Sequence, residues 1–215
     1  MAPMSLKHET GPVRRQQIID AARKLIILKG SEHVTIKGLA HEVGISEAAI
    51  YRHFNGKRDV MLLLVDDVGA NLLNDIKDSG SKKGRDVIDR LNHILNRHIS
   101  AIEQRRGVSF QVIAEIISLG DRGLNARVAD IVDRYIARLK TLLEEGIGTG
   151  ELRKDLNAEA TAVLIFGLTQ GVVNLWALNN YGFDLKKRYN TLWSTLRQTI
   201  TGDGAGYVMK ESKPK

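Results

Sequence analysis

The sequence predicts an all-α protein, and three observations favour that fold class. Apolar residues recur at the three- and four-residue spacing of helices in most segments of the chain. No segment shows the two-residue alternation typical of a half-buried strand. Only 3 prolines and 5% aromatic residues occur among 215, a composition that disfavours a β-sandwich. The 43% apolar content is ordinary for a globular protein.

The two helices expected nearest the N-terminus have clear start and stop signals. The first has its apolar repeat over residues 18–26, with Pro12 just before its start and Gly30 just past its end. The second is expected to have Thr35 as its N-cap and to end at Gly44, because Ser and Thr favour N-caps and Gly favours helix ends.

A third short helix and six longer segments complete the predicted order. Ser46 is expected to cap the third helix, and Asn55-Gly56 to end it. The DSGSKKG segment at 78–84 is predicted to be a linker, and GIGTGEL at 146–152 a turn. The longer helices are expected over residues 57–76, 85–104, 108–118, 122–145, 158–179 and 184–200.

Composition excludes several classes of function. The absence of cysteine rules out disulfides, a thiolate nucleophile and cysteine-ligated metal. No uninterrupted apolar run reaches the roughly 18 residues of a membrane span, and residues 1–15 have no apolar core of a secretory signal. His93 and His98 are five residues apart and do not share a helix face as metal ligands do. We therefore expect a soluble cytoplasmic protein with no cofactor, no metal and no enzymatic site.

Positive charge is concentrated near the N-terminus. The total is +7, and residues 1–60 contribute +4 from ten Lys and Arg against six Asp and Glu. Residues 61–200 contribute only +2, although they are more than twice as many. A small basic unit on a nearly neutral body indicates a polyanion as the partner of the first part.

Residues 35–54, TIKGLAHEVGISEAAIYRHF, have the layout of a helix-turn-helix. Gly44 permits the positive φ of a tight turn, and Ile45 is expected to fill the gap between the two helices. Ala40 is small enough to let the crossing helices approach. The outward face of the second helix could then enter a DNA major groove, which is about 12 Å wide.

This segment resembles the TetR/AcrR family of bacterial one-component transcriptional regulators. The residues that carry the resemblance are Thr35-Ile36, Leu39-Ala40, Val43-Gly44-Ile45-Ser46, Ile50-Tyr51, His53-Phe54 and Lys57. The resemblance covers roughly residues 15–60, while the rest of the chain is similar to the family only in length and helical content. It implies a DNA-binding, helix-turn-helix transcriptional repressor that works as a homodimer.

The resemblance also implies a role for each residue of the motif. Thr35, Tyr51, His53 and Lys57 correspond to residues that contact backbone phosphates, which position the protein without reading sequence. Ser46 would begin the recognition helix. Thr35 and Ser46 as helix caps alone, Tyr51 as a packing ring, and His53 and Lys57 as ordinary solvated residues are the alternatives.

Base reading would fall to the outward residues of the recognition helix, which are Glu47, Ala48, Ala49 and Arg52. Arg52 is the best guanine reader among them. The sequence departs from the family here, because Glu47 replaces a common Lys, Arg or Pro and the two alanines replace Gly-Thr or Gly-Ser. Glu47 favours the helix start but repels phosphate, so direct readout is expected to be sparse.

Residues 158–179 are apolar on nearly all sides, which predicts a helix buried all round. A second subunit could supply the cover, and two DNA half-sites also require a two-fold protein. The family resemblance implies a dimer built from the last two helices. The alternative is that these residues fill a monomer core. The expected interface residues are Leu164, Gly167, Leu168, Gly171, Leu175, Leu192 and Leu196.

The resemblance further implies a small-molecule pocket in the C-terminal part. Candidates are polar residues on otherwise apolar helices with nearby apolar walls, a mixture typical of ligand sites but also of a hydrogen-bonded core. Gln170 and Asn174 lie one turn apart and are expected to face the same way. The candidates are Phe110, Gln111, Ile113, Glu115, Tyr135, Gln170, Asn174 and Trp176.

Together these features predict four parts. Residues 1–11 form a mobile segment, 12–56 the three-helix DNA-binding domain, 57–201 a larger helical ligand-binding and dimerisation domain, and 202–215 a flexible tail. The function expected is a repressor released from a palindromic operator by a small molecule. Two alternatives stay open: an effector-independent architectural or division-control protein with the same reader, and a helical scaffold or enzyme in which the motif is coincidental.

Overall fold

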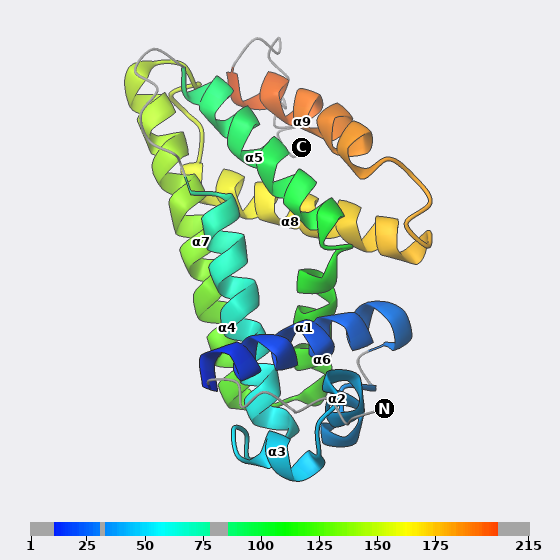
Figure 1. Ribbon diagram of the computed structural model, residues 1–215. Helices are drawn as coiled ribbons and strands as arrows, with labels where there is room; N and C mark the ends of the chain where they lie inside the picture. The colour runs from blue at the N-terminus through cyan, green and yellow to red at the C-terminus, as the bar shows by residue number, and fades with distance from the viewer. Residues whose placement is uncertain (1–10, 31–32, 78–85, 202–215) are drawn as a thin grey trace, which may run out of the picture. The chain divides into compact units, whose positions relative to one another are not determined.

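The computed structural model of the chain describes residues 11–30, 33–77 and 86–201, apart from the side chain of Ile27. Three predictions lie outside the described residues: a mobile segment at 1–10, a linker at 78–84 and a flexible tail at 202–215. Gly11, which was expected in the mobile segment, begins a helix. Within these ranges the elements are helices, with no strand, which confirms the predicted all-α class (Figure 1).

The helices agree with the predicted order. Their bounds are α1 Gly11–Lys29, α2 Ile36–Val43, α3 Glu47–Tyr51, α4 Lys57–Asp75, α5 Val87–Gln104, α6 Val108–Leu119, α7 Arg122–Thr149, α8 Ala158–Leu178 and α9 Leu185–Thr201. Pro12 lies within the first turn of α1, where a missing N–H costs nothing, and Gly30 follows its end with a φ of 94°.

Helix α7 continues past the point where a turn was expected. Gly146 lies inside this helix. A Cβ at that position would come within 2.8 Å of the Leu152 side chain and 3.0 Å of Val87. The glycine therefore serves close packing rather than chain reversal. The helix ends instead at Gly150, whose φ of 79° is a left-handed conformation that glycine adopts readily.

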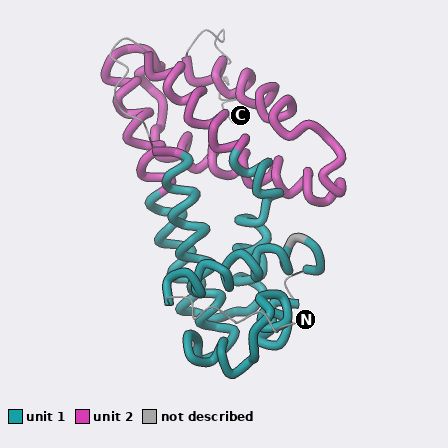
Figure 2. Tube along the Cα trace, in the orientation of Figure 1, with its two compact units in different colours: residues 1–75, 101–134 teal, residues 76–100, 135–215 magenta. Residues whose placement is uncertain are grey.

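The chain folds into two compact units, each built from two separate segments of the sequence (Figure 2). Unit 1 contains residues 1–75 and 101–134, and unit 2 contains residues 76–100 and 135–215. Unit 1 therefore joins the three N-terminal helices to α4, α6 and the start of α7, which lie beyond the boundary expected at residue 56. Its helices share one apolar core that includes Ile18, Leu39, Ile50, Val60, Leu64, Val112 and Ile116.

Unit 2 has its own core, formed by the described parts of α5, α7, α8 and α9. His98 and Tyr135 are each 1% exposed, and their rings lie 5.5 Å apart. The Tyr135 ring also meets Phe166 edge-on at 5.5 Å. His98 is thus a buried core residue, and no group of three or more His, Asp or Glu able to hold a metal occurs among the described residues.

Helix α8 has two different faces within unit 2. One face is buried and includes Ala162, Ile165, Val172 and Trp176. The other exposes large apolar side chains, which are Val163, Leu164, Leu175 and Leu178. The sequence predicted a helix buried all round. Within the single chain only one face of α8 is buried.

By length and composition α8 could also cross a membrane, although no run of that length was expected. The apolar average over the window stays high despite Thr161, Thr169 and Gln170. Core helices of globular domains pass the same test, and the buried face of α8 is sufficient reason for its composition.

Candidate DNA-binding surface

The turn between α2 and α3 is built as the motif requires. The Thr35 hydroxyl accepts a hydrogen bond from the Gly38 N–H at 2.9 Å, and the Ser46 hydroxyl accepts one from the Ala49 N–H at 3.2 Å. Both residues are therefore N-caps, which satisfy otherwise orphaned backbone donors. Gly44 has a φ of 74°, and the next N–H, of Ile45, donates to the Ala40 carbonyl at 3.0 Å.

The two helices of the motif are fixed from below by the core of unit 1. Leu39 and Ile50 are fully buried, and Phe54 is 5% exposed. Gly38 is also required, because a Cβ there would lie 2.6 Å from the His33 carbonyl oxygen. This need could not be predicted from local spacing, because the contact depends on where the chain enters α2. The packing orients α3 rigidly against α2.

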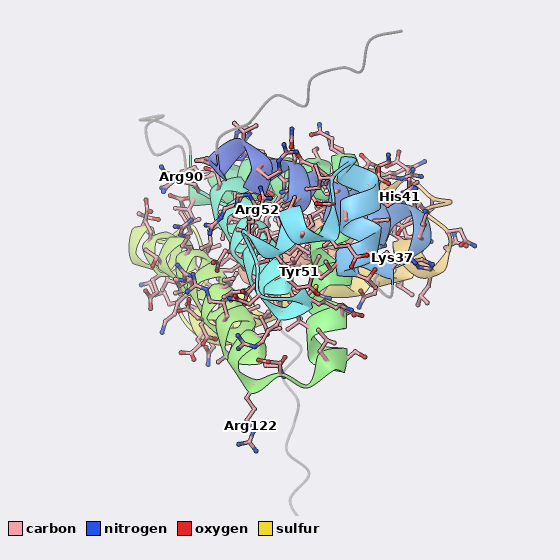
Figure 3. The ribbon with its side chains drawn as sticks, turned by 60° about the horizontal axis from the view of Figure 1, so that its bottom comes forward. Lys37, His41, Tyr51, Arg52, Arg90 and Arg122 are labelled. Carbon is pink, nitrogen blue, oxygen red and sulfur yellow. The ribbon has the colours of Figure 1, made fainter. Side chains whose placement is uncertain are left out.

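The outward residues of the motif are exposed to solvent (Figure 3). Tyr51 is 54% exposed, and Glu47, Ala48 and Arg52 are exposed as well. Ala49 is half-buried, so it is less accessible than the other three residues expected to read bases. Because α3 ends at Tyr51, Arg52 lies just past the helix rather than on its face.

Two of the expected phosphate contacts have partners within unit 1. The His53 ring is half-buried, with its centroid 6.5 Å from that of Phe54. The Lys57 ammonium lies 3.3 Å from a carboxylate oxygen of Glu115 in α6. Lys57 is therefore not an ordinary solvated lysine, and its pairing was not foreseen.

Basic residues of α2 extend the same surface. Lys37 and His41 are exposed and lie four residues apart, so they share one face of the helix (Figure 3). Lys37 and His41 were not among the expected DNA-contacting residues, although their four-residue spacing in the sequence indicates a shared helix face. On the half-buried side of α2, the hydrogen bond from Lys24 lowers the pKa of Glu42, which keeps that carboxylate ionised.

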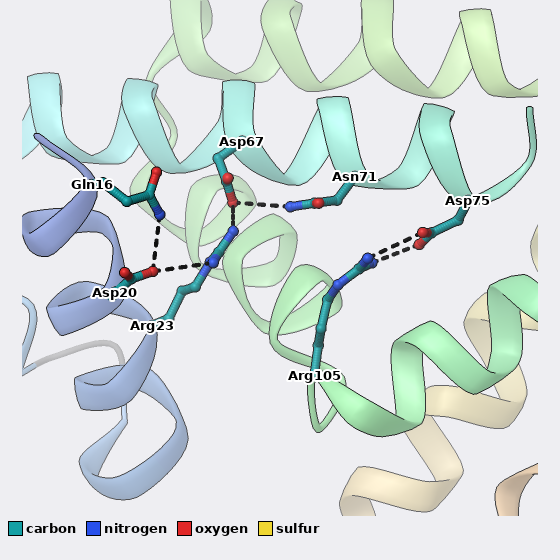
Figure 4. A network of polar contacts seen from close by, with 7 residues as sticks. All are labelled: Gln16, Asp20, Arg23, Asp67, Asn71, Asp75 and Arg105. Carbon is teal, nitrogen blue, oxygen red and sulfur yellow. Dashed lines mark hydrogen bonds and ion pairs between the residues drawn. The ribbon is translucent and has the colours of Figure 1, made fainter. Parts of the chain in front are cut away.

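Helix α4, which follows the motif, is tied to the rest of unit 1 by ion pairs along its length. Asp67 pairs with Arg23 of α1, and Asp75 accepts two hydrogen bonds from Arg105 at 2.6 and 3.1 Å (Figure 4). Further pairs join Arg58 to Asp121 at 2.7 Å and Asp66 to Arg127 at 2.7 Å.

The charged residues at the two ends of α4 pair with residues outside the helix. Lys57 and Arg58 lie at the start of the helix and Asp75 at its end. The helix dipole favours the opposite order. Pairing with other helices compensates for that cost. In the same way, the Arg58 guanidinium holds the pKa of Asp121 down at about 2.

The expected effector residues are divided between the two units. In unit 1, Phe110 and Ile113 are buried, Gln111 is half-buried and Glu115 holds Lys57. A cavity of about 10 Å³ lies beside Ile113, among aliphatic side chains of α4, α6 and α7. That is about the space of one water and far below the roughly 300 Å³ of a small-molecule site.

In unit 2 the candidates differ in exposure. Tyr135 and Trp176 are buried at 1% and 5% exposure, Gln170 is half-buried and Asn174 is exposed. Gln170 and Asn174 therefore do not share an environment, although they lie one turn apart. The Gln170 carbonyl oxygen and the Trp176 N–H are both buried without a hydrogen-bond partner, so this part of the core contains polar groups that are not satisfied internally.

Five of the seven expected interface residues line one groove between α8 and α9. Leu164 lies on the same exposed face, 55% exposed, while the groove itself is lined by Gly167, Leu168, Gly171, Leu175 and Leu192. Leu196 is 8% exposed and belongs to the core of unit 2. A Cβ at Gly167 or Gly171 would meet no atom within 4 Å. Packing within the chain therefore does not require a glycine at either position.

A helix-turn-helix with an exposed basic face, on an all-α chain, defines a class of DNA-binding regulator. Residues 18–64 match the family described as bacterial regulatory proteins, tetR family. Residues 67–199, more than half of the chain, match the C-terminal region of YsiA-like proteins. The chain belongs to the TetR family, and the resemblance drawn from its motif is confirmed. The chain is therefore a DNA-binding regulatory protein of that family.

Known relatives are similar over most of their length. The fatty acid metabolism regulator protein of Bacillus subtilis is 24% identical over 84% of this chain and 92% of its own. The nucleoid occlusion factor SlmA of Marinomonas sp. is 24% identical over 87% and 94%. The two family models that match the chain describe regulatory proteins and the C-terminal region of YsiA-like proteins.

Solved structures show the same fold. The fatty acid degradation regulator FadR of Bacillus halodurans has a TM-score of 0.71 at 24% identity, covering 94% of this chain and 98% of its own. FadR of Bacillus subtilis in complex with stearoyl-CoA has a TM-score of 0.72 at 24% identity, covering 86% and 98%.

Proposed function

We propose that the protein is a homodimeric transcriptional repressor, and that a long-chain fatty acyl-CoA releases it from a palindromic operator. Residues 12–56 would read DNA, and residues 57–201 would bind the effector and form the dimer. It would act in the cytoplasm, at the nucleoid. The observation that carries the proposal is the exposed motif face on a rigid unit 1, together with an unpartnered apolar face on α8.

The dimer is proposed from the groove on unit 2. Leu164 and Leu175 are each 55% exposed on α8, and Leu178 is 81% exposed. Exposed apolar side chains in a continuous row mark interaction surfaces. Gly167 and Gly171 each cost α8 about 1 kcal/mol relative to alanine, and a close approach by a second copy of the helix would compensate for it.

Contacts with DNA divide into positioning and reading. Thr35, Tyr51, His53 and Lys57 would contact phosphates, and the basic face of Lys37 and His41 would add to them. Arg52 would read a guanine, whereas Glu47 and the two alanines offer few hydrogen bonds to base edges. Specificity would therefore rest on few direct contacts and on DNA shape.

The effector class is proposed from the relatives. The B. subtilis relative is named for fatty acid metabolism, and FadR of the same species was solved with stearoyl-CoA. By linkage, an effector that weakens DNA binding must itself bind more weakly to the DNA complex, by the same factor of typically 5- to 150-fold. The cavity beside Ile113 is only about 10 Å³, so a ligand that binds there would need a conformer in which the surrounding helices separate.

A second candidate is effector-independent binding to the nucleoid. Several relatives are named nucleoid occlusion factor SlmA, at 22–25% identity over more than 80% of this chain. Such a protein would bind DNA equally well with and without acyl-CoA. Titration with stearoyl-CoA therefore separates the two candidates.

The experiment is selection of binding sites from random duplexes at two salt concentrations, followed by titration of the selected complex with stearoyl-CoA. We expect a palindrome with half-sites about 34 Å apart and at least fivefold weaker DNA binding at saturating stearoyl-CoA. Selected sites without two-fold symmetry would refute the dimeric reader. A palindrome whose affinity is unchanged by stearoyl-CoA would refute the acyl-CoA effector and favour the second candidate.

A further inference from the structure

One ion pair of unit 1 involves a residue assigned to DNA. The Lys57 Nζ donates to a carboxylate oxygen of Glu115 at 3.3 Å. The Lys57 side chain is 35% exposed and that of Glu115 only 16%. The lysine can therefore reach solvent, whereas the carboxylate is largely enclosed by the protein.

Both partners are fixed at their backbones. Lys57 is the first residue of α4, and Glu115 lies in α6 between the buried residues Ile113 and Ile116. The neighbouring pair of Arg58 and Asp121 ties the same turn of α4 to the residue that precedes α7. The Lys57 side chain, with its flexible four-carbon stem and greater exposure, is the partner better able to turn to another anion.

The Lys57 ammonium can pair either with the Glu115 carboxylate or with a DNA phosphate. A lysine ammonium is a compact single charge, and a carboxylate and a phosphate oxygen both accept its hydrogen bonds. If Lys57 turns to a phosphate, the hydrogen bond and ion pair between its ammonium and the Glu115 carboxylate are lost. DNA binding through Lys57 must therefore overcome the attraction of Glu115.

We propose that Glu115 competes with the DNA phosphate for Lys57 and so restrains the affinity of the protein for DNA of every sequence. The proposal rests on the proposed function, in which Lys57 contacts a phosphate. Because phosphate contacts are common to all sites, the restraint acts on non-specific and operator binding alike. Since Glu115 belongs to α6, the position of that helix sets the strength of the restraint.

The test is Glu115→Gln, which keeps the shape of the side chain and removes its charge. Ion pairs near the protein surface correspond to about a two- to fivefold change in an equilibrium constant. We expect Glu115→Gln to tighten binding by that factor at about 50 mM salt, for the operator and for a random duplex alike. The gain should shrink by 200 mM salt, because salt screens the pair.

The matched control is Asp66→Asn, which removes the same charge from another α4 ion pair. Asp66 pairs with Arg127 at 2.7 Å and lies nine residues further along α4, about 13 Å at 1.5 Å per residue. We expect a smaller gain in affinity than for Glu115→Gln. Equal gains in the two variants would show a general charge effect and overturn the proposal.

The decisive measurement repeats Glu115→Gln in a Lys57→Met background. Lys57→Met alone should weaken binding to all sequences and lower the salt slope by about 0.9 for each subunit bound, and Glu115→Gln should then have no effect. A gain that persists without Lys57, or weaker binding from Glu115→Gln alone, would overturn the proposal. Thermal melting of each variant confirms folding, and Glu115→Ala provides a second removal of the charge.

The outcomes also separate this inference from the proposed function. If Lys57→Met leaves affinity and salt slope unchanged, the phosphate role of Lys57 is wrong and the restraint with it. A palindromic site selected by the same protein would still support the dimeric repressor. If no duplex binds, the proposed function itself fails.

Discussion

Helices α4 and α8 both have a glycine in their interior, but they use it in opposite ways. A Cβ on Gly69 of α4 would lie 2.5 Å from Ile131, whereas a Cβ on Gly167 of α8 would meet nothing within 4 Å. Helix α4 is also tied by ion pairs to its neighbours in unit 1, while α8 leaves Leu164 and Leu175 exposed. Thus the packing of α4 is explained by contacts within the chain, whereas the described residues leave one apolar face of α8 uncovered.

The largest effect should come from placing charge on the exposed face of α8. The double substitution Leu164→Glu with Leu175→Glu would put two carboxylates into a contact that excludes water, a severe cost. We expect a monomer by analytical ultracentrifugation and operator binding weakened by about 100-fold or more, because the second half-site no longer binds within one complex.

The control for that variant is Leu119→Glu in unit 1, at a leucine that is 45% exposed. It replaces an exposed apolar side chain that does not line the groove with a carboxylate and should leave the mass in solution unchanged. A dimer that persists in the double variant would show that the exposed face of α8 lies in solvent and that the subunits associate through another surface.

Filling the space at Gly69 should be the next largest effect. Gly69→Val would force the Ile131 side chain and the α4 backbone apart, and overpacking of this kind costs about 1–3 kcal/mol. Chemical denaturation should show that loss of unfolding free energy with unchanged dimer affinity. An unaltered stability would mean that α4 and α7 can separate freely at this point.

The matching change at Gly167 should have the opposite sign within the subunit. Gly167→Ala meets open space and improves helix propensity, by up to about 1 kcal/mol. If a second α8 approaches closely there, the same methyl group weakens the dimer. We therefore expect higher stability of the monomer, measured on the Leu164→Glu, Leu175→Glu background, together with a larger dimer dissociation constant on the wild-type background.

Much of the reader could be predicted because its determinants are local. The caps at Thr35 and Ser46 and the left-handed turn at Gly44 each depend on residues within four positions of themselves, so spacing alone indicates them. The burial of Leu39 and Ile50 follows from the helical period in the same way.

The remaining features depend on contacts between residues distant in sequence. Glu115 was expected beside a ligand, but it pairs with Lys57, 58 positions earlier. Gly146 was expected in a turn, but it packs inside α7 because Leu152 lies against it. Leu196 has the same apolar character as Leu192, yet only the fold decides that Leu196 is buried in the subunit. Periodicity identifies an apolar face without indicating what covers it.

The smallest predicted effect concerns the ion pair between Arg58 and Asp121, which ties the start of α4 to the residue that precedes α7. The hydrogen bonds from Arg58 and from the Leu124 N–H lower the pKa of Asp121 from 3.8 to about 2. A lowered folded-state pKa contributes stability above pH 4 that is lost as pH falls from about 4 through 2.

Because Asp121 and Arg58 face solvent, the contribution is screened and small. Carboxylate chemical shifts should show Asp121 still ionised at pH 3, where an unpaired aspartate is mostly protonated. Arg58→Gln should raise this pKa toward its ordinary value, while the cap to Leu124 keeps it somewhat lowered. An Asp121 that titrates near 3.8 in the intact protein would mean that this end of α4 is not held by its neighbours, and the contrast with α8 would then be weaker.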